Sequence, residues 1–75
     1  MITVYTKPGC MPCKMTCHKL MQMGVPHKLT DVTLNDDDMA VVIGLGYREM
    51  PVVVNGDDHW SGFRPDKLAA LGGGE

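Results

Sequence analysis

The sequence contains few aromatic residues, no long apolar run and no cluster of basic residues. Its 75 residues include only one tryptophan, two tyrosines and one phenylalanine. No apolar stretch approaches the roughly 20 residues that a membrane-spanning helix needs, so no membrane partner is expected. Seven Lys and Arg residues against nine Asp and Glu residues give a formal net charge of −2, with the signs mixed along the chain. This balance argues against nucleic acid as the main partner.

The start of the chain lacks the pattern of a signal peptide. Residues 1–4 read Met-Ile-Thr-Val, without a charged region or an apolar core, so no export signal is expected. Three cysteines, an odd number, do not form the paired framework of a small secreted protein. We therefore expect one monomeric domain over residues 1–75, located in the reducing cytoplasm. A chain this short buries only about 60% of its unfolded surface.

A closely spaced cysteine pair, Cys10-Met11-Pro12-Cys13, carries most of the chemical information. It follows a strand-like run and precedes a helical pattern. A thiolate at a helix N-terminus faces unpaired N–H groups and the positive end of the helix dipole, and both lower its pKa. The order of strand, cysteine pair and helix is therefore typical of a dithiol redox site, although the spacing alone also fits half of a zinc site.

Hydrophobic periodicity and turn residues predict seven elements in the order β-α-β-α-β-β-α. Pro12 fits the first turn of the first helix and Gly24 its end, whereas Asn35 is a good cap for the second helix. The run Asn55–Asp58 is typical of a hairpin turn. The expected strands are 2–6, 27–33, 51–54 and 59–61; the expected helices are 11–23, 36 to a cap at Gly46, and 65–71, with a frayed tail at 72–75.

These elements predict an α/β fold with a four-stranded mixed sheet flanked by three helices. The first βαβ unit pairs in parallel through a right-handed crossover, and the last two strands form an antiparallel hairpin. The side chains expected to face the core are Cys13, Cys17, Leu20 and Met21 of the first helix, Leu29 and Val32 of the second strand, and Met39, Val42, Ile43 and Gly46 of the second helix.

The element order, the cysteine pair at the first helix and the proline at the third strand resemble the thioredoxin/glutaredoxin fold. Within that superfamily, the run W-S-G-F-R-P-D at residues 60–66 is similar to the NrdH-type redoxins. Two further runs, V-Y-T-K-P at residues 4–8 and G-Y-R-E-M-P-V-V at residues 46–53, support the same resemblance. The resemblance covers nearly the whole chain.

The resemblance implies a dithiol–disulfide oxidoreductase of the bacterial cytosol, encoded by the chromosome or by a phage, with no bound cofactor. Such proteins donate electrons to class Ib ribonucleotide reductase by reducing a disulfide near the C-terminus of its large subunit. They are recharged by NADPH through thioredoxin reductase rather than by glutathione. Glutaredoxins that use glutathione typically carry a Gly-Gly pair before the last helix, where this chain has Ser61-Gly62-Phe63.

The two cysteines of the pair have different expected roles. Cys10 lies nearest the helix start, with Lys7 three residues before it as a local cation, and is the expected nucleophile. Cys13 is the expected resolving thiol and the more buried of the two. Met11 and Pro12 complete the expected surroundings of the active site.

The resemblance also implies partner-binding residues beyond the cysteines. Pro51 is expected in the cis form, with Met50 presenting backbone groups to a bound peptide. Trp60, Phe63 and Met50 are expected to rim a shallow apolar groove beside Cys10, and a position in the core is the alternative for Trp60.

Four residues of the W-S-G-F-R-P-D run complete this expected set. Arg64 is expected to meet carboxylates on the reductase tail, with a solvated surface position as the alternative. Ser61 and Asp66 are expected to support the loop by hydrogen bonding and capping, around Gly62.

Three other functions stay open. The first is a glutathione-dependent glutaredoxin, and the second is a metal-binding module built on Cys10, Cys13 and Cys17. The neighbouring His18 faces about 100° away around the helix, so a buried, inert Cys17 and no metal are favoured. The third is a redox-silent interaction domain. The three histidines follow no triad or metal spacing and are expected at the surface.

Overall fold

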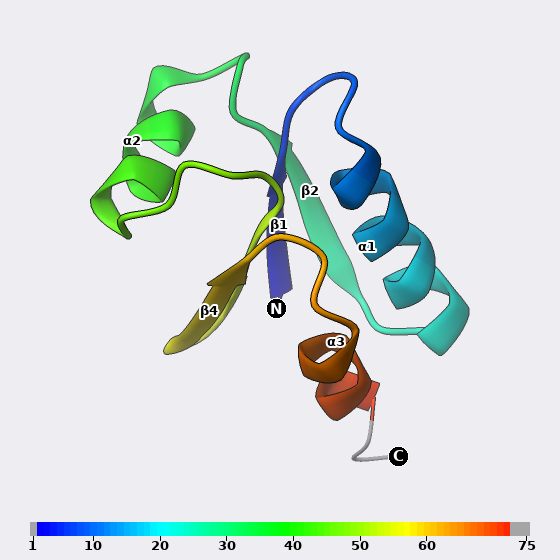
Figure 1. Ribbon diagram of the computed structural model, residues 1–75. Helices are drawn as coiled ribbons and strands as arrows, with labels where there is room; N and C mark the ends of the chain where they lie inside the picture. Colours follow the sequence, from blue (N-terminus) through cyan, green and yellow to red (C-terminus); the bar gives the residue numbers. More distant parts are fainter. Residues whose placement is uncertain (1, 73–75) are drawn as a thin grey trace.

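The computed structural model describes residues 2–72 and contains one four-stranded sheet with three helices (Figure 1). The strands follow the order β2-β1-β3-β4 across the sheet. The predicted fold class and element order are confirmed. The bounds are β1 Ile2–Thr6, α1 Met11–Met23, β2 His27–Asp31, α2 Asp36–Gly44, β3 Val52–Asn55, β4 Asp58–Ser61 and α3 Pro65–Gly72. Gly72, predicted as the first tail residue, ends α3, and the rest of the predicted tail lies outside the described residues.

The strand β1 occupies an inner position in the sheet, between β2 and β3. It pairs in parallel with β2 and antiparallel with β3, and β3 continues into β4 through a two-residue turn at Gly56 and Asp57. Gly56 has a φ of 61°, which glycine adopts without steric cost. The register places Val4 beside Val53 and Val53 beside Trp60. These three side chains therefore form one row across the sheet.

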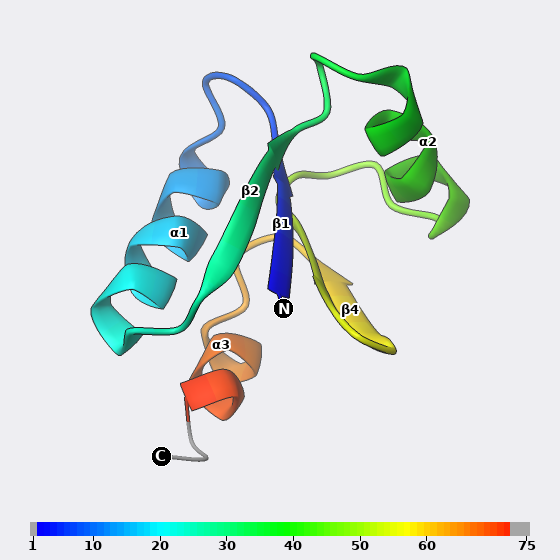
Figure 2. The same cartoon turned by 180° about the vertical axis from the view of Figure 1, so that it is seen from behind.

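The helices cover the two faces of the sheet unequally. Both views show α1 and α3 together on one side and α2 alone on the other (Figures 1 and 2). The core divides accordingly into two clusters of buried residues. The first contains Ile2, Val4, Leu20, Val53, Trp60 and Leu68, and the second contains Cys10, Cys13, Val32, Val42, Met50 and Val52. Successive side chains of β3 point to opposite faces of the sheet, so Val52 and Val53 belong to different clusters.

The ends of the first two helices follow from single residues. Gly24 adopts a left-handed conformation with φ 69°, and its N–H returns to the carbonyls at the end of α1, as expected for a helix C-terminus. The side-chain oxygen of Asn35 accepts a hydrogen bond from the N–H of Asp37 at 2.8 Å and caps α2. None of the helices within residues 2–72 is long and apolar enough to cross a membrane.

Four residues predicted to face the core are exposed instead. One of them is Gly46, which lies beyond the end of α2, because the helix ends at Gly44 and its C-cap residue is Leu45. Met21 and Ile43 are 72% and 65% exposed, because each lies about 100° around its helix from a buried neighbour, Leu20 or Val42. Leu29 is 56% exposed, because β2 is an edge strand with a neighbouring strand on one side only. A residue not predicted as core, Thr16, is fully buried.

Candidate functional site

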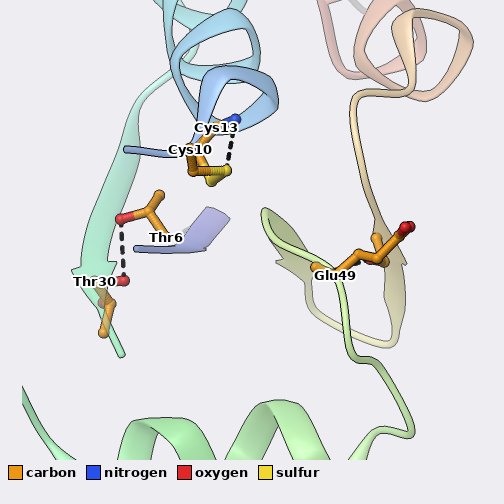
Figure 3. Close-up of a disulfide and its surroundings, with 6 residues drawn as sticks. Thr6, Cys10, Cys13, Thr30 and Glu49 are labelled. Carbon is orange, nitrogen blue, oxygen red and sulfur yellow. Dashed lines mark hydrogen bonds between the residues drawn. A yellow bond between two sulfur atoms is a disulfide. The ribbon is translucent and has the colours of Figure 1, made fainter. Parts of the chain in front are cut away.

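The cysteine pair forms a disulfide at the start of α1 (Figure 3). Cys10 has extended backbone dihedrals and is the N-cap residue of the helix. The backbone N–H of Cys13 donates a hydrogen bond to the Sγ of Cys10 at 3.2 Å. The first-turn N–H groups of a helix have no partner within the helix. The same position therefore favours negative charge on the Cys10 sulfur once the disulfide is reduced.

Both cysteines are buried within the core cluster that also contains Val42 and Met50. Cys10 is 6% exposed and Cys13 is 4% exposed. Cys10 lines a groove of about 540 Å³ at the surface, whereas Cys13 does not. The geometry thus gives Cys10 the better access to a large partner.

Four segments of the chain build this groove, which we call the disulfide groove. They are the loop after β1, the first turn and a half of α1, the loop before β3 and the loop after β4. Figure 3 shows the loop before β3, marked by Glu49, facing the cysteine end of α1. The residues that line the disulfide groove are Lys7, Gly9, Cys10, Met11, Pro12, Met15, Arg48, Glu49, Met50, Gly62 and Phe63.

Two hydrogen bonds hold the loop after β4 against the loop before β3. The N–H of Gly62 donates to the carbonyl oxygen of Pro51 at 2.8 Å, and the hydroxyl of Ser61 donates to the carbonyl oxygen of Glu49 at 2.7 Å. The peptide bond between Met50 and Pro51 is cis, as predicted. These bonds fix Phe63 and Met50 on the same groove.

Trp60 lies in the core and not on the rim of the groove. It is 3% exposed and packs with Val53 and Leu68, and it is absent from the groove lining. The prediction that its ring rims the groove is therefore wrong, and the alternative position in the core is the observed one. The reason is register: Trp60 pairs with Val53, whose side chain points to the face covered by α1 and α3.

Arg64 and Asp66 form an ion pair on the surface beside the groove. The guanidinium donates two hydrogen bonds to the carboxylate, at 3.2 and 3.0 Å. These hydrogen bonds hold the pKa of the Asp66 carboxyl below its ordinary value. Both side chains are largely exposed, and neither lines the groove. Asp66 lies in the first turn of α3, so the ion pair joins the loop after β4 to the start of this helix.

Comparison with known proteins gives a consistent result. The sequence pattern of the glutaredoxin family matches residues 2–60. The chain belongs to that family. It is 37% identical to the glutaredoxin-like protein NrdH of Salmonella typhimurium over 93% of this chain and 86% of the relative. It is also 40% identical to the gene 56 protein of mycobacterium phage L5, over 93% of this chain and 70% of that protein.

Among solved structures, the glutaredoxin-like protein NrdH-redoxin of Escherichia coli superposes with a TM-score of 0.90 at 34% identity, covering 93% of this chain and 92% of that one. The family resemblance inferred from the W-S-G-F-R-P-D run is therefore confirmed. The redoxin is a thiol–disulfide oxidoreductase with a redox-active pair at Cys10 and Cys13.

Cys17 stands one helical turn beyond the disulfide and is half-buried against the core. Burial raises the pKa of its thiol. It lines a second depression of about 300 Å³ together with Cys10 and Cys13. Within residues 2–72, no group of three or more His, Cys, Asp or Glu side chains is placed to hold a metal ion.

Four residues of the disulfide groove were not predicted from the sequence: Gly9, Met15, Arg48 and Glu49. Met15 follows Met11 by four residues, so the two side chains share one helical face. That spacing is a signal that could have identified it. Arg48 and Glu49 come from an irregular segment whose direction no periodicity predicts.

Two of the three histidines differ from their predicted surface positions. His27 is half-buried at the start of β2, and its Nδ1 lies 2.8 Å from the carbonyl oxygen of Val25. His59 is half-buried on β4, and its Nδ1 is hydrogen-bonded to the hydroxyl of Tyr47 at 2.7 Å. The two rings also meet edge to face, with centroids 5.5 Å apart. This pair attaches the segment after α2 to the sheet and so supports the loop before β3.

Proposed function

We propose that this redoxin carries two electrons at a time from thioredoxin reductase to class Ib ribonucleotide reductase. Its substrate is a disulfide near the C-terminus of the large reductase subunit. NADPH supplies the electrons through thioredoxin reductase, and the redoxin itself holds no cofactor. It acts as a monomer in the cytosol of a bacterium, as a chromosomal or a phage gene product.

The chemistry balances with the two thiols alone. The Cys10 thiolate attacks one sulfur of the partner disulfide, forms a mixed disulfide and releases the other partner sulfur as a thiolate. The Cys13 thiolate then attacks the Cys10 sulfur, breaks the mixed disulfide and releases the partner dithiol. The redoxin is left with its Cys10–Cys13 disulfide, which thioredoxin reductase reduces again. The helix start at Cys10 and its place on the groove support its role as the nucleophile.

The observation that carries the choice of electron source is Phe63. Its side chain lines the groove beside Cys10, at the place where glutathione-using glutaredoxins carry a glycine pair. A bulky ring there occupies space that a tripeptide ligand needs. The E. coli relative is described as having a thioredoxin-like activity profile, which agrees with the same source.

NADPH consumption during disulfide reduction tests this proposal. One reaction contains thioredoxin reductase, and the other contains glutathione with glutathione reductase. We expect turnover with thioredoxin reductase only, followed by deoxyribonucleotide formation when class Ib reductase is added. Phe63→Gly is expected to gain activity with glutathione, and Phe63→Leu serves as the matched control that keeps a bulky side chain. Turnover of the unaltered protein with glutathione alone would overturn the proposal.

A further inference from the structure

A second groove lies next to the disulfide groove, on the side of α2. Its volume is about 290 Å³, and we call it the α2 groove. Lys7, Arg48 and Met50 line both grooves. The two grooves are therefore adjacent, and their linings together extend from Phe63 past Cys10 to Ile43 of α2.

The floor and far wall of the α2 groove are apolar. Val42 is buried at its base, Met39 is half-buried, and Ile43 stands at its rim with 65% of its surface exposed. Solvent exposure of a large aliphatic side chain beside a groove gives a partner apolar surface to cover. The α2 groove is therefore suited to an aliphatic side chain.

The boundary between the two grooves is positively charged. Lys7 and Arg48 are exposed there, and neither belongs to the two ion pairs found within residues 2–72. The acidic Glu49 lines the disulfide groove but not the α2 groove. A carboxylate placed between the grooves would meet two unpaired cations, and Arg48 could bind it through paired hydrogen bonds.

We infer that an extended, disulfide-bearing segment of the partner protein occupies both grooves. Its cysteine lies over Cys10, an acidic side chain lies at Lys7 and Arg48, and an aliphatic side chain lies against Ile43. The inference rests on the proposed function, because the occupant is a protein disulfide. Beyond the proposed function, the inference states what the redoxin recognises: an acidic and an aliphatic residue of the partner, both on the same side of the partner's cysteine.

Single-turnover reduction of cyclic disulfide peptides by the pre-reduced redoxin tests the inference. The peptides carry Asp and Leu at varied spacings on either flank of the disulfide, and their controls carry Lys for Asp or Ser for Leu. We expect the best Asp and Leu peptide to react roughly tenfold faster than its Ser control and roughly threefold faster than its Lys control.

Four exposed positions give matched variants. Arg48→Glu is expected to remove or reverse the preference for Asp over Lys, whereas Lys28→Glu, on β2 outside both grooves, is expected to keep it. Ile43→Asn is expected to remove the preference for Leu, whereas Val41→Asn on the same helix is expected to keep it. The small neutral disulfide bis(2-hydroxyethyl) disulfide is expected to be reduced equally by the unaltered redoxin and by the two control variants, Lys28→Glu and Val41→Asn. Each peptide rate is therefore divided by the rate of the same protein with this small disulfide, so that a general change in the reactivity of Cys10 cancels.

The result that overturns the inference is equal reduction of all peptides by the unaltered redoxin. Loss of a preference in Lys28→Glu or Val41→Asn to the same extent as in its partner variant also overturns it. The reaction contains no thioredoxin reductase and no ribonucleotide reductase. Failure of the proposed electron source or acceptor therefore does not change the outcome, and the two proposals are tested separately.

Discussion

The hydroxyl of Ser61 donates a hydrogen bond to the carbonyl oxygen of Glu49 at 2.7 Å, across the gap between two loops. Ser61 ends β4, and Glu49 lies just before the cis peptide bond that leads into β3. The bond thus joins two of the four segments that build the disulfide groove, the loop before β3 and the loop after β4. It places a residue of the W-S-G-F-R-P-D run in a supporting position without contact to the cysteines.

Ser61→Ala removes this bond and is expected to loosen the groove. Loss of a partly exposed hydrogen bond lowers the free energy of unfolding by roughly 0.5–1.5 kcal/mol. We expect a higher KM for a protein disulfide and an unchanged rate with a small neutral disulfide. Ser61→Thr keeps the hydroxyl and is the control. Chemical denaturation and steady-state kinetics check both effects, and an unchanged KM in Ser61→Ala would show that the bond does not shape the groove.

The two cysteines are expected to give different trapped products. Cys13→Ser leaves the Cys10 thiolate able to attack but removes the thiol that resolves the mixed disulfide. A covalent complex with the disulfide partner should then accumulate and be visible on a non-reducing gel. Cys10→Ser should form little or none. Equal trapping by both variants would contradict the assignment of Cys10 as the nucleophile.

Thr16→Val is expected to stabilise the protein. Thr16 is fully buried on α1, and its Oγ1 has no hydrogen-bond partner within the described residues. A buried hydroxyl without a partner costs free energy, and valine has nearly the same shape and helix propensity. We expect a gain of about 1 kcal/mol, or roughly 4–8 °C in Tm for a chain of this size.

The comparison variant for this position is Thr16→Ser, which keeps the hydroxyl and loses the methyl group. We expect it to be less stable than the unaltered protein. Differential scanning calorimetry of all three proteins provides the measurement. A lower Tm in Thr16→Val would indicate that the hydroxyl has a partner in solution.

Cys17 is expected to react slowly with alkylating reagents in the oxidised protein. Burial raises the pKa of its thiol, and only the thiolate is nucleophilic. At pH 8 we expect labelling by iodoacetamide to be slower than in the denatured chain, because a smaller fraction of the folded protein carries the thiolate. Mass spectrometry of labelled protein over a pH series measures this, with denatured protein as control.

The raised pKa of Cys17 also determines how the free energy of unfolding changes with pH. The neutral thiol is favoured in the folded protein, so the unfolded chain loses its proton at lower pH. The stabilisation is complete below the pKa of the unfolded chain and is lost as pH rises through the folded pKa. Labelling of the folded and denatured proteins at equal rates would contradict this account of Cys17.

The sequence predicts the regular elements well, because local signals specify them. The bounds of α1 agree to the residue, since Pro12 and Gly24 mark both of its ends. The cap at Asn35 and the turn at Gly56 also follow from local chemistry. The cis form of Pro51 is different, because a cis bond before proline is uncommon and only the family resemblance predicted it.

The positions that the sequence did not predict depend on how the elements meet. Ile43 fits the apolar pattern of its helix, yet α2 presents only one narrow stripe to the sheet. The position of Trp60 depends on strand register, which places it beside Val53 and not beside Cys10. Arg48 belongs to an irregular segment, so its place on the groove follows only from the three-dimensional path of the chain.

Because the disulfide is buried in the same cluster as Val42, its redox state is expected to affect helix α2. A change at Cys10 and Cys13 is expected to alter the packing beneath α2, because both cysteines share a buried cluster with Val42. The helix begins more than twenty residues further along the chain. Local opening of a helix depends on the apolar contacts beneath it. The amide hydrogen exchange of α2 is therefore expected to differ between the dithiol and disulfide forms. If the proposed partner segment contacts Ile43, its affinity for this helix is then expected to differ between the dithiol and disulfide forms.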